Sequence, residues 1–258
     1  MKHSEEVHKT SWWTSRERTS GPTMQSTVLT VLKEISRLAP FLLSVFIYFA
    51  LASQSSCPVW LRAFLKCLPI LLLCAYILTL RIDLHTHSKA PKLLAGLLFS
   101  AVGDILRSLS SQFHLLHGDS MFGLSHICYI WMFGLKPLNL LAGVFLLVIG
   151  TVYLLFLSRC LWEHQPLQWA AYIYIGLIGT MVWRASAGAL FNHQWSWVKL
   201  FATVGGMLLA VSDFTYTVSA FCFPVYHSGM IAATYYLAQM LITLSAVYSE
   251  SAVGKNRK

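Results

Sequence analysis

Long apolar runs recur along the chain, and short polar segments separate them. Eight runs are candidates to cross the hydrocarbon core of a bilayer, about 30 Å thick, as α-helices. They lie near residues 36–53, 59–80, 91–110, 121–136, 138–158, 168–190, 198–220 and 228–249. The least distinct are the first, which is short, and the fourth and fifth, which only Lys136-Pro137 separates. The pattern predicts an all-α, polytopic membrane protein with eight transmembrane helices.

The polar segments define the expected domain boundaries. Residues 1–32 are rich in Ser, Thr, Arg and Glu, so we expect a disordered tail there. Residues 33–250 form one membrane domain, and residues 251–258 form a basic C-terminal tail. No apolar core follows Met1 closely enough for a cleaved signal peptide. We therefore expect an integral membrane protein that, in a eukaryote, is inserted at the endoplasmic reticulum.

Composition and charge agree with this class. Only 11% of the residues are charged, 56% are hydrophobic, and the mean hydropathy is +0.60. If both termini are cytosolic, fourteen Lys and Arg residues lie on the cytosolic side and three on the other, as the positive-inside rule requires. The three are Arg62, Arg107 and Arg159. Topology and anionic lipids therefore explain the net charge of +9, and no motif indicates a nucleic-acid partner.

Two acids interrupt apolar segments in a related way. AGLLFSAVGDIL places Asp104 eight residues after Gly96, and GGMLLAVSDFTYT places Asp213 eight residues after Gly205. The segments match in kind at an offset of 109 residues, and the same offset carries His126 onto Tyr235. We interpret this as a duplicated four-helix unit, with repeats at about 36–136 and 138–249. Because four helices return the chain to its starting side, the repeats would be parallel.

Other polar residues also fall inside apolar runs. They are Lys66, His126, Arg184, Tyr235 and Gln239, and the last two share one helix face. Four charges near helix centres would cost roughly 10–14 kcal/mol on an insertion scale, so they must be paired or hydrated. One interpretation is a functional chamber; the other is that Asp104 and Asp213 pair with Lys66 and Arg184 only to lock helix packing. His126, Tyr235 and Gln239 could equally form ordinary interhelical hydrogen bonds.

Histidine and cysteine spacings do not indicate a metal site or another cofactor. We place the pairs His85/His87 and His114/His117, and Asp119, in solvated loops. The six cysteines form no CxxC pair. Cys57, Cys160 and Cys222 fall near the non-cytosolic ends of helices, where a disulfide can form, but the spacing does not select a pair. No GxSxG, P-loop or HExxH motif occurs.

Five segments together resemble the YhhN-like lysoplasmalogenase (transmembrane protein 86) family of eight-helix membrane hydrolases. They are KCLPILLLCAYIL at 66–78, AGLLFSAVGDIL, MVWRASAGAL at 181–190, GGMLLAVSDFTYT and ATYYLAQMLI at 233–242. The resemblance covers about residues 35–250. It implies hydrolysis of the vinyl-ether bond of a lysophospholipid, a lysoplasmenylcholine or lysoplasmenylethanolamine, to a fatty aldehyde and the corresponding glycerophospho-alcohol.

The implied chemistry suits two carboxyl groups. A vinyl ether opens when its outer alkenyl carbon is protonated, and a second carboxyl can stabilise the resulting cation and activate water. We therefore expect Asp104 and Asp213 to be catalytic. Lys66 or Arg184 would hold the phosphate, while His126, Tyr235 and Gln239 would complete the substrate site.

Two other functions remain compatible with the residues. A proton-coupled transporter of lipids or other amphiphiles would use the same acids to carry protons. A non-catalytic membrane scaffold would tolerate neutral replacements of the charged residues. Headgroup preference, oligomeric state and the identity of the proton donor do not follow from the sequence.

Overall fold

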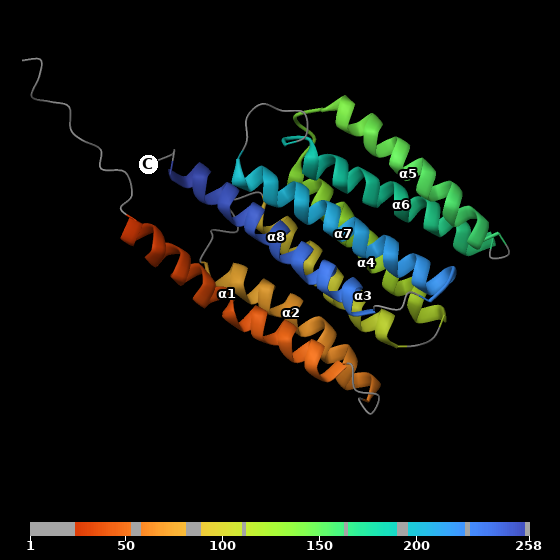
Figure 1. Cartoon of the computed structure of the whole chain (residues 1–258), viewed down its shortest axis with the longest axis horizontal. Coiled ribbons are helices and arrows are strands. Elements are labelled where there is room, and N and C mark those ends of the chain that lie inside the picture. Colours follow the sequence, from red (N-terminus) through yellow and green to blue (C-terminus); the bar gives the residue numbers. More distant parts are fainter. Residues whose placement is uncertain are drawn as a thin grey trace, which may run out of the picture. The chain divides into compact units, whose positions relative to one another are not determined.

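The computed structural model describes residues 24–52, 58–80, 89–109, 112–162, 165–189, 196–224 and 228–255. Within these ranges the chain is all-α, as predicted, with eight helices (Figure 1). They are α1 (Met24–Ala52), α2 (Val59–Thr79), α3 (Ala90–Ser108), α4 (Gln112–Phe133), α5 (Leu140–Cys160), α6 (Gln165–Ser186), α7 (Trp197–Phe221) and α8 (Ser228–Lys255). Residues 1–23 of the expected N-terminal tail, together with Cys57, His85 and His87, lie outside the described residues.

Four helical segments have the length and apolar composition of membrane spans: α2, α5, α7 and Gly229–Glu250 of α8. A shorter apolar segment covers Ser36–Leu51 of α1. Helices α3, α4 and α6 fall outside this group, and each carries polar or charged side chains that are buried in the structure, such as Asp104, His126 and Arg184. These three helices can carry polar residues because neighbouring helices bury the polar side chains.

The start of α4 differs from the prediction. We expected an apolar run from 121 and placed His114, His117 and Asp119 in a loop, which is wrong, because α4 begins at Gln112. The first two turns look like a loop by hydropathy, but Asp119 is neutralised by a contact with Arg107 of α3. At the other end of the chain, α8 continues to Lys255, into the segment expected to be a C-terminal tail.

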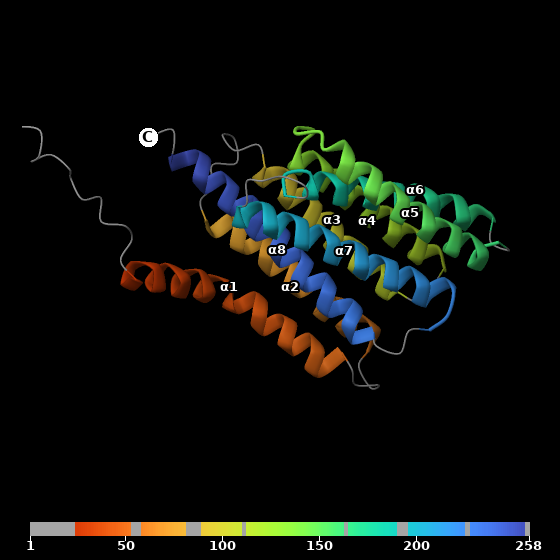
Figure 2. The ribbon, with the colours of Figure 1, turned by 45° about the horizontal axis from the view of Figure 1, so that its top comes forward.

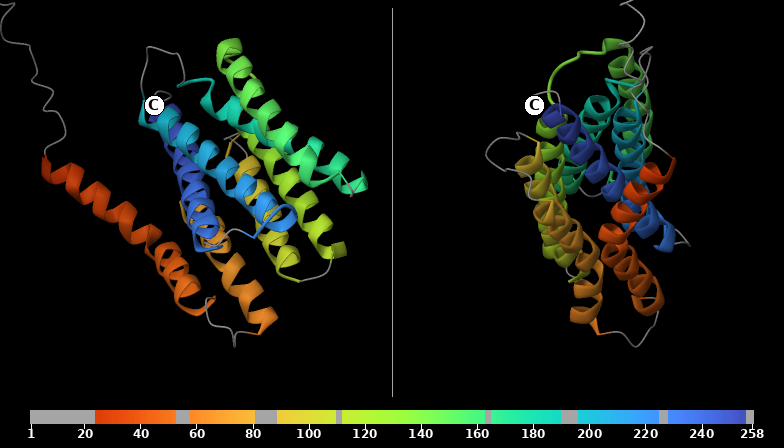
Figure 3. Two further views of the ribbon diagram at one scale, coloured as in Figure 1. Left: turned by 45° about the vertical axis from the view of Figure 1, so that its right-hand side comes forward. Right: turned by 90° about the vertical axis from the view of Figure 1, so that its left-hand side faces the viewer.

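Residues 40–258 form one compact unit. Within it, α3 packs closely on α4 and α7 on α8, while α5 packs mainly on α6 (Figures 2 and 3). Glycines permit the close approach of α3 and α4: a Cβ on Gly103 would lie 2.7 Å from the Phe122 ring, and one on Gly118 would lie 3.1 Å from the backbone nitrogen of Arg107. This approach brings the end of α3 against the beginning of α4, where charged residues of both helices meet.

The ends of α5 and α7 are joined covalently. Cys160 and Cys222 form a disulfide, with their Cα atoms 5.3 Å apart. Leu157, Leu161 and Ile175 form a buried apolar cluster beside this bond. The structure thus selects one pair among the three cysteines that the sequence placed near the non-cytosolic face.

Candidate functional site

Asp104 of α3 is held by residues of α2 and α8. Its side chain is only 1% exposed, its Oδ1 lies 3.2 Å from the Lys66 ammonium, and its Oδ2 accepts a hydrogen bond of 2.7 Å from the Tyr235 hydroxyl. Lys66 and Tyr235, two of the residues expected at the substrate site, therefore contact Asp104. Two donors to one carboxyl favour its ionised form.

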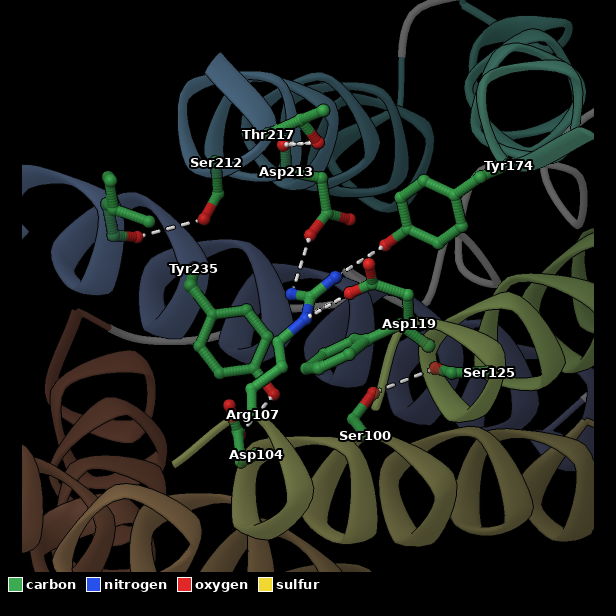
Figure 4. A network of polar contacts seen from close by, with 12 residues as sticks. Ser100, Asp104, Arg107, Asp119, Ser125, Tyr174, Ser212, Asp213, Thr217 and Tyr235 are labelled. Carbon is green, nitrogen blue, oxygen red and sulfur yellow. Dashed lines mark hydrogen bonds and ion pairs between the residues drawn. The ribbon is translucent and has the colours of Figure 1, made fainter. Parts of the chain in front are cut away.

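Arg107, one turn beyond Asp104, is the centre of a second set of contacts (Figure 4). Its Nε donates to Asp119 Oδ1 at 2.7 Å, and its Nη1 lies 3.5 Å from Asp213 Oδ1. Its Nη2 donates to the Tyr174 hydroxyl at 3.3 Å. The guanidinium also lies between the rings of Phe122 and Tyr216, 3.9 and 4.1 Å from their centroids. One arginine thus links α3, α4, α6 and α7.

His126 and Asp213 face each other across α4 and α7. His126 Nδ1 lies 2.6 Å from the Phe122 carbonyl oxygen, which can only accept, so Nδ1 carries a proton. His126 Nε2 then points at Asp213 Oδ2 from 3.3 Å. Neither atom has a hydrogen-bond partner among the residues that the structure describes. Two unprotonated acceptors would repel each other at this distance, so the geometry favours a proton between the two atoms.

Gln239 lies one turn from Tyr235 in a neutral network. Its Oε1 accepts from the Tyr129 hydroxyl at 2.7 Å, and its Nε2 donates to Ser100 Oγ at 3.3 Å. Ser100 and Ser125 are themselves 2.8 Å apart. This buried network continues the Asp104–Tyr235 contact along the interface of α3 and α8, because Ser100 is also one turn from Asp104.

Positions 109 residues apart make reciprocal contacts. Tyr235 of the second half contacts Asp104 of the first, while its counterpart His126 contacts Asp213. Likewise, Ser108 Oγ donates to the Asp104 carbonyl oxygen and Thr217 Oγ1 to that of Asp213. Arg107 contacts Tyr216, the residue at its own equivalent position. Each half of the chain therefore supplies a partner for the acid of the other half.

An apolar cavity of about 290 Å³ opens beside the cluster, between α4 and α6. Leu124, Ile127 and Ile173 line it and are exposed on the helix surfaces. Its polar lining includes Asp119 and Tyr174, both of which contact Arg107. Tyr174 also packs edge-on against His126, with ring centroids 5.5 Å apart. The cavity thus extends from the apolar surface of the helices to the residues that surround Asp213.

Arg184 does not join this cluster, in contrast to the expected pairing with an acid. Its Nε donates to the Gly134 carbonyl oxygen at 2.7 Å, and its Nη2 donates to that of Pro137 at 3.0 Å. These residues follow the last turn of α4, whereas Asp119 lies near the first, about 20 Å away along the helix axis. The cation near Asp213 is Arg107, which our sequence analysis assigned only to topology.

Arg107, Asp119 and Tyr174 are therefore the site residues that the sequence analysis missed. A signal existed for Arg107, because a residue three positions after Asp104 lies near the same helix face. Asp119 was hidden by the polar surroundings that suggested a loop. Tyr174 carried no signal, since tyrosine is common in membrane helices. In the described part of the chain, no group of three or more His, Cys, Asp or Glu side chains could hold a metal ion.

Known proteins match this chain over most of its length. A model of the YhhN family matches residues 61–246. The chain is 39% identical over 233 residues to "Lysoplasmalogenase TMEM86A" of Bos taurus, a match that covers 89% of this chain and 96% of that protein. It is 35% identical over 214 residues to "Lysoplasmalogenase TMEM86B" of Sus scrofa, covering 82% and 87% of the two chains.

A bacterial relative is more distant. The chain is 32% identical over 162 residues to "Uncharacterized membrane protein YhhN" of Escherichia coli O157:H7, covering 60% of this chain and 73% of that one. No solved structure matches the chain.

Proposed function

Because the chain belongs to the YhhN family, we propose that it is an integral-membrane lysoplasmalogenase that hydrolyses the vinyl-ether bond of lysoplasmenylcholine or lysoplasmenylethanolamine. The observation that carries the proposal is the buried His126–Asp213 pair beside an apolar cavity whose lining includes Tyr174, a direct neighbour of His126. The names of the relatives from Bos taurus and Sus scrofa support the same activity.

The charges of the cluster support a proton on the His126–Asp213 pair. Two cations and three carboxyls surround the site, so one additional proton makes the cluster neutral. These groups are Lys66, Arg107, Asp104, Asp119 and Asp213. Burial makes an uncompensated charge expensive, and neutrality therefore favours the protonated pair. We infer that this pair is the proton donor.

The reaction then balances without a cofactor. The pair transfers its proton to the outer alkenyl carbon, and the π electrons of the vinyl ether form the new C–H bond. Water attacks the resulting oxocarbenium carbon, forming a C–O bond, and gives its proton to a carboxylate. In the hemiacetal, the His126–Asp213 pair takes the hydroxyl proton as the C=O bond forms, and the C–O bond to glycerol breaks while the protonated carboxyl gives its proton to the leaving oxygen. One water is consumed, and both groups return to their starting protonation states.

Asp104 is suited to the second carboxyl role. Lys66 and Tyr235 donate to it, which keeps it ionised, so it can stabilise the developing cation and receive the proton of the water. Lys66 is 24% exposed and is the cation of the cluster that we propose for the substrate phosphate. Gln239 would fix the position of α8 and thereby of Tyr235, because its contacts are with other side chains of the bundle.

The cavity between α4 and α6 is suited to the alkenyl chain. Its mouth lies among exposed apolar side chains that would face lipid, so a lysolipid could enter sideways from the bilayer. Tyr174 separates the cavity from His126 and would have to rotate to admit the vinyl ether. A substrate with one apolar chain and one phosphate therefore matches the two features of the proposed site: the apolar cavity for the chain and Lys66 for the phosphate.

The proposal includes the architecture around the site. We propose that all eight helices cross the membrane as two parallel four-helix repeats, because the reciprocal contacts of Asp104 and Asp213 are those expected around a pseudo-twofold axis. We place both termini in the cytosol and the protein in the endoplasmic reticulum. The Cys160–Cys222 disulfide supports this orientation, because it joins helix ends on the expected non-cytosolic side, where disulfides persist.

Three lysolipids that differ at one bond test the activity. Purified protein incubated with the vinyl-ether lysolipid should release fatty aldehyde, detected by mass spectrometry. The saturated alkyl ether should bind and survive, because it has no alkene to protonate. Comparable cleavage of the alkyl ether would refute the acid-addition mechanism, and rapid release of fatty acid from the ester analogue would instead indicate a lysophospholipase. Uptake of intact lysolipid into liposomes without any product would favour the transporter.

A further inference from the structure

A second pocket, lined in part by basic side chains, lies at the opposite end of the helices from the acid cluster. It has a volume of about 130 Å³ and is enclosed by the start of α3, the α4–α5 connection and the ends of α6, α7 and α8. Its lining includes four basic side chains: Lys89, Lys136, Arg184 and Lys199. No acidic side chain lines it among the described residues. All four positions belong to helix ends that the charge pattern places on or near the cytosolic side.

Arg184 supplies a donor for this pocket. Its side chain is buried, with 4% of the residue exposed, and its Nε and Nη2 already bind backbone carbonyls of the α4–α5 connection. Its Nη1 is also buried and has no hydrogen-bond partner within the described residues. A buried guanidinium N–H without an acceptor is costly, so an anion in the pocket would satisfy it.

The neighbouring groups favour an anion at the same place. The Lys89 ammonium donates to Ser249 Oγ at 3.0 Å, which leaves further protons on the nitrogen. Lys136 is exposed at the mouth of the pocket. The Glu250 carboxylate, beside Lys89, accepts hydrogen bonds from the backbone N–H groups of Lys89 and Ala90. Burial lowers the pKa of Lys89 and the charge of Glu250 opposes that shift; a bound anion would oppose it too.

We propose that this pocket binds a phosphate-bearing anion at the cytosolic face, separately from the substrate site. Arg184 Nη1 donates to one phosphate oxygen, and Lys89 and Lys136 neutralise its charge. Basic pockets between transmembrane helices on this side bind the headgroups of anionic lipids. The same chemistry accepts free phosphate, which therefore has to be tested as a second source.

A purely structural role would explain only part of the observations. Arg184 does hold the α4–α5 connection, but two of its nitrogens suffice for that. Structural support does not account for the third, unsatisfied nitrogen or for the lysines that gather around the same space.

The test measures the binding of two probes to the purified full-length chain in a neutral detergent. Binding is monitored by titration calorimetry at fixed ionic strength. The probes are inorganic phosphate and dioctanoyl phosphatidic acid, with dioctanoyl phosphatidylcholine as the zwitterionic comparison. We expect saturable binding of phosphatidic acid at one site. Lys89→Gln and Lys136→Gln should each weaken it about tenfold, the effect of losing one charge-assisted interaction.

Lys92→Gln is the matched control. Lys92 is also near the start of α3 and loses the same charge, but it packs over Trp131 and does not line the pocket. We expect its affinity to stay within about twofold of the wild type. Arg184→Gln should abolish binding. If the Arg184→Gln variant does not fold, the two lysine variants still test the pocket.

The outcomes show whether the pocket recognises a lipid headgroup or free phosphate. If inorganic phosphate binds and competes with phosphatidic acid, the phosphate group alone is recognised; if only phosphatidic acid binds, the site belongs to a lipid headgroup. Absence of saturable binding of both probes would overturn the proposal. So would equal losses in Lys136→Gln and Lys92→Gln, because they would indicate nonspecific attraction. The assay needs no turnover, so it does not depend on the proposed activity.

Discussion

Asp104 and Asp213 occupy equivalent positions in two similar segments, but their partners differ. Asp104 accepts from a lysine and a tyrosine, whereas Asp213 lies 3.3 Å from the ring nitrogen of a histidine. The difference arises from single residues, since His126 and Tyr235 are themselves at equivalent positions. Two similar sequence segments thus give their acids different surroundings, which is what the proposed roles of general acid and charge-stabilising carboxylate need.

Neutral replacement of each acid tests this assignment. We expect Asp104→Asn and Asp213→Asn each to lower aldehyde release by roughly 10²- to 10⁴-fold, because an amide supplies neither a proton nor a negative charge. The double variant should lose little more than the worse single one, since the residues act as a unit. Thermal unfolding should show that the variants remain folded. Near-wild-type turnover in both folded variants would remove the two acids from the mechanism.

Arg107 supports the charge balance of the site, because it contacts both Asp119 and Asp213. Removing one partner of a buried ion pair typically costs about 3–5 kcal/mol. We therefore expect Arg107→Gln to lower the unfolding midpoint clearly. Arg159→Gln is the control: it removes the same charge from an exposed position at the end of α5 and should cost less than about 0.5 kcal/mol. Equal stability of the two variants would contradict the central position of Arg107.

At the scale of elements, the approach of α3 to α4 positions the charged residues. A Cβ on Gly103 would lie 2.7 Å from the Phe122 ring and 3.2 Å from the Gly118 carbonyl oxygen, so the lack of a side chain at Gly103 permits the close approach. The Arg107–Asp119 contact follows directly from that approach, because both residues lie within one turn of the crossing. Elsewhere in the bundle, the Cys160–Cys222 disulfide fixes α5 to α7.

Two Gly→Ala substitutions distinguish the effect of close helix packing from the effect of alanine on helix stability. Gly103→Ala places a methyl group 2.7 Å from the Phe122 ring, so α3 and α4 must move apart. We expect a loss of about 1–3 kcal/mol in stability, with reduced turnover as Asp119 leaves Arg107. Gly176→Ala in α6 meets nothing within 4 Å and should be neutral or slightly stabilising. If Gly103→Ala behaved like Gly176→Ala in both measurements, the close approach would be unimportant.

At the scale of the whole molecule, the acid cluster and the basic pocket lie near opposite ends of the helices. The four basic residues of the pocket come from ends that the charge rule assigns to the cytosol. The disulfide lies at the ends assigned to the other side. Two independent kinds of observation therefore agree with one orientation.

Labelling of single introduced cysteines tests that orientation. Leu138, between α4 and α5, and Leu109, at the end of α3, are both exposed and should lie on opposite sides. In sealed microsomes, a membrane-impermeant thiol reagent should label Leu138→Cys readily and Leu109→Cys only after the membrane is opened. The parent protein provides the background from the cysteines that the chain already contains. The reverse pattern would invert the proposed topology.

The sequence by itself determined the all-α class, most helix positions, the buried acids and their relation by 109 residues. These features are local: apolar runs of sufficient length form helices in a bilayer, and a repeated pattern is visible without any three-dimensional contact. The need to pair or hydrate the buried charges also followed, and the sequence offered Lys66 and Arg184 as partners of the two acids without assigning them.

Only the tertiary structure decided which cation serves Asp213. Arg184 was the plausible partner by its place in an apolar run, but its side chain binds carbonyl groups at the far end of α4, and Arg107 takes the role instead. The structure also brought Asp119 and Tyr174 to the site and gathered distant basic residues into a second pocket. These outcomes depend on helix rotation and on side-chain reach, which residue spacing along one chain does not specify.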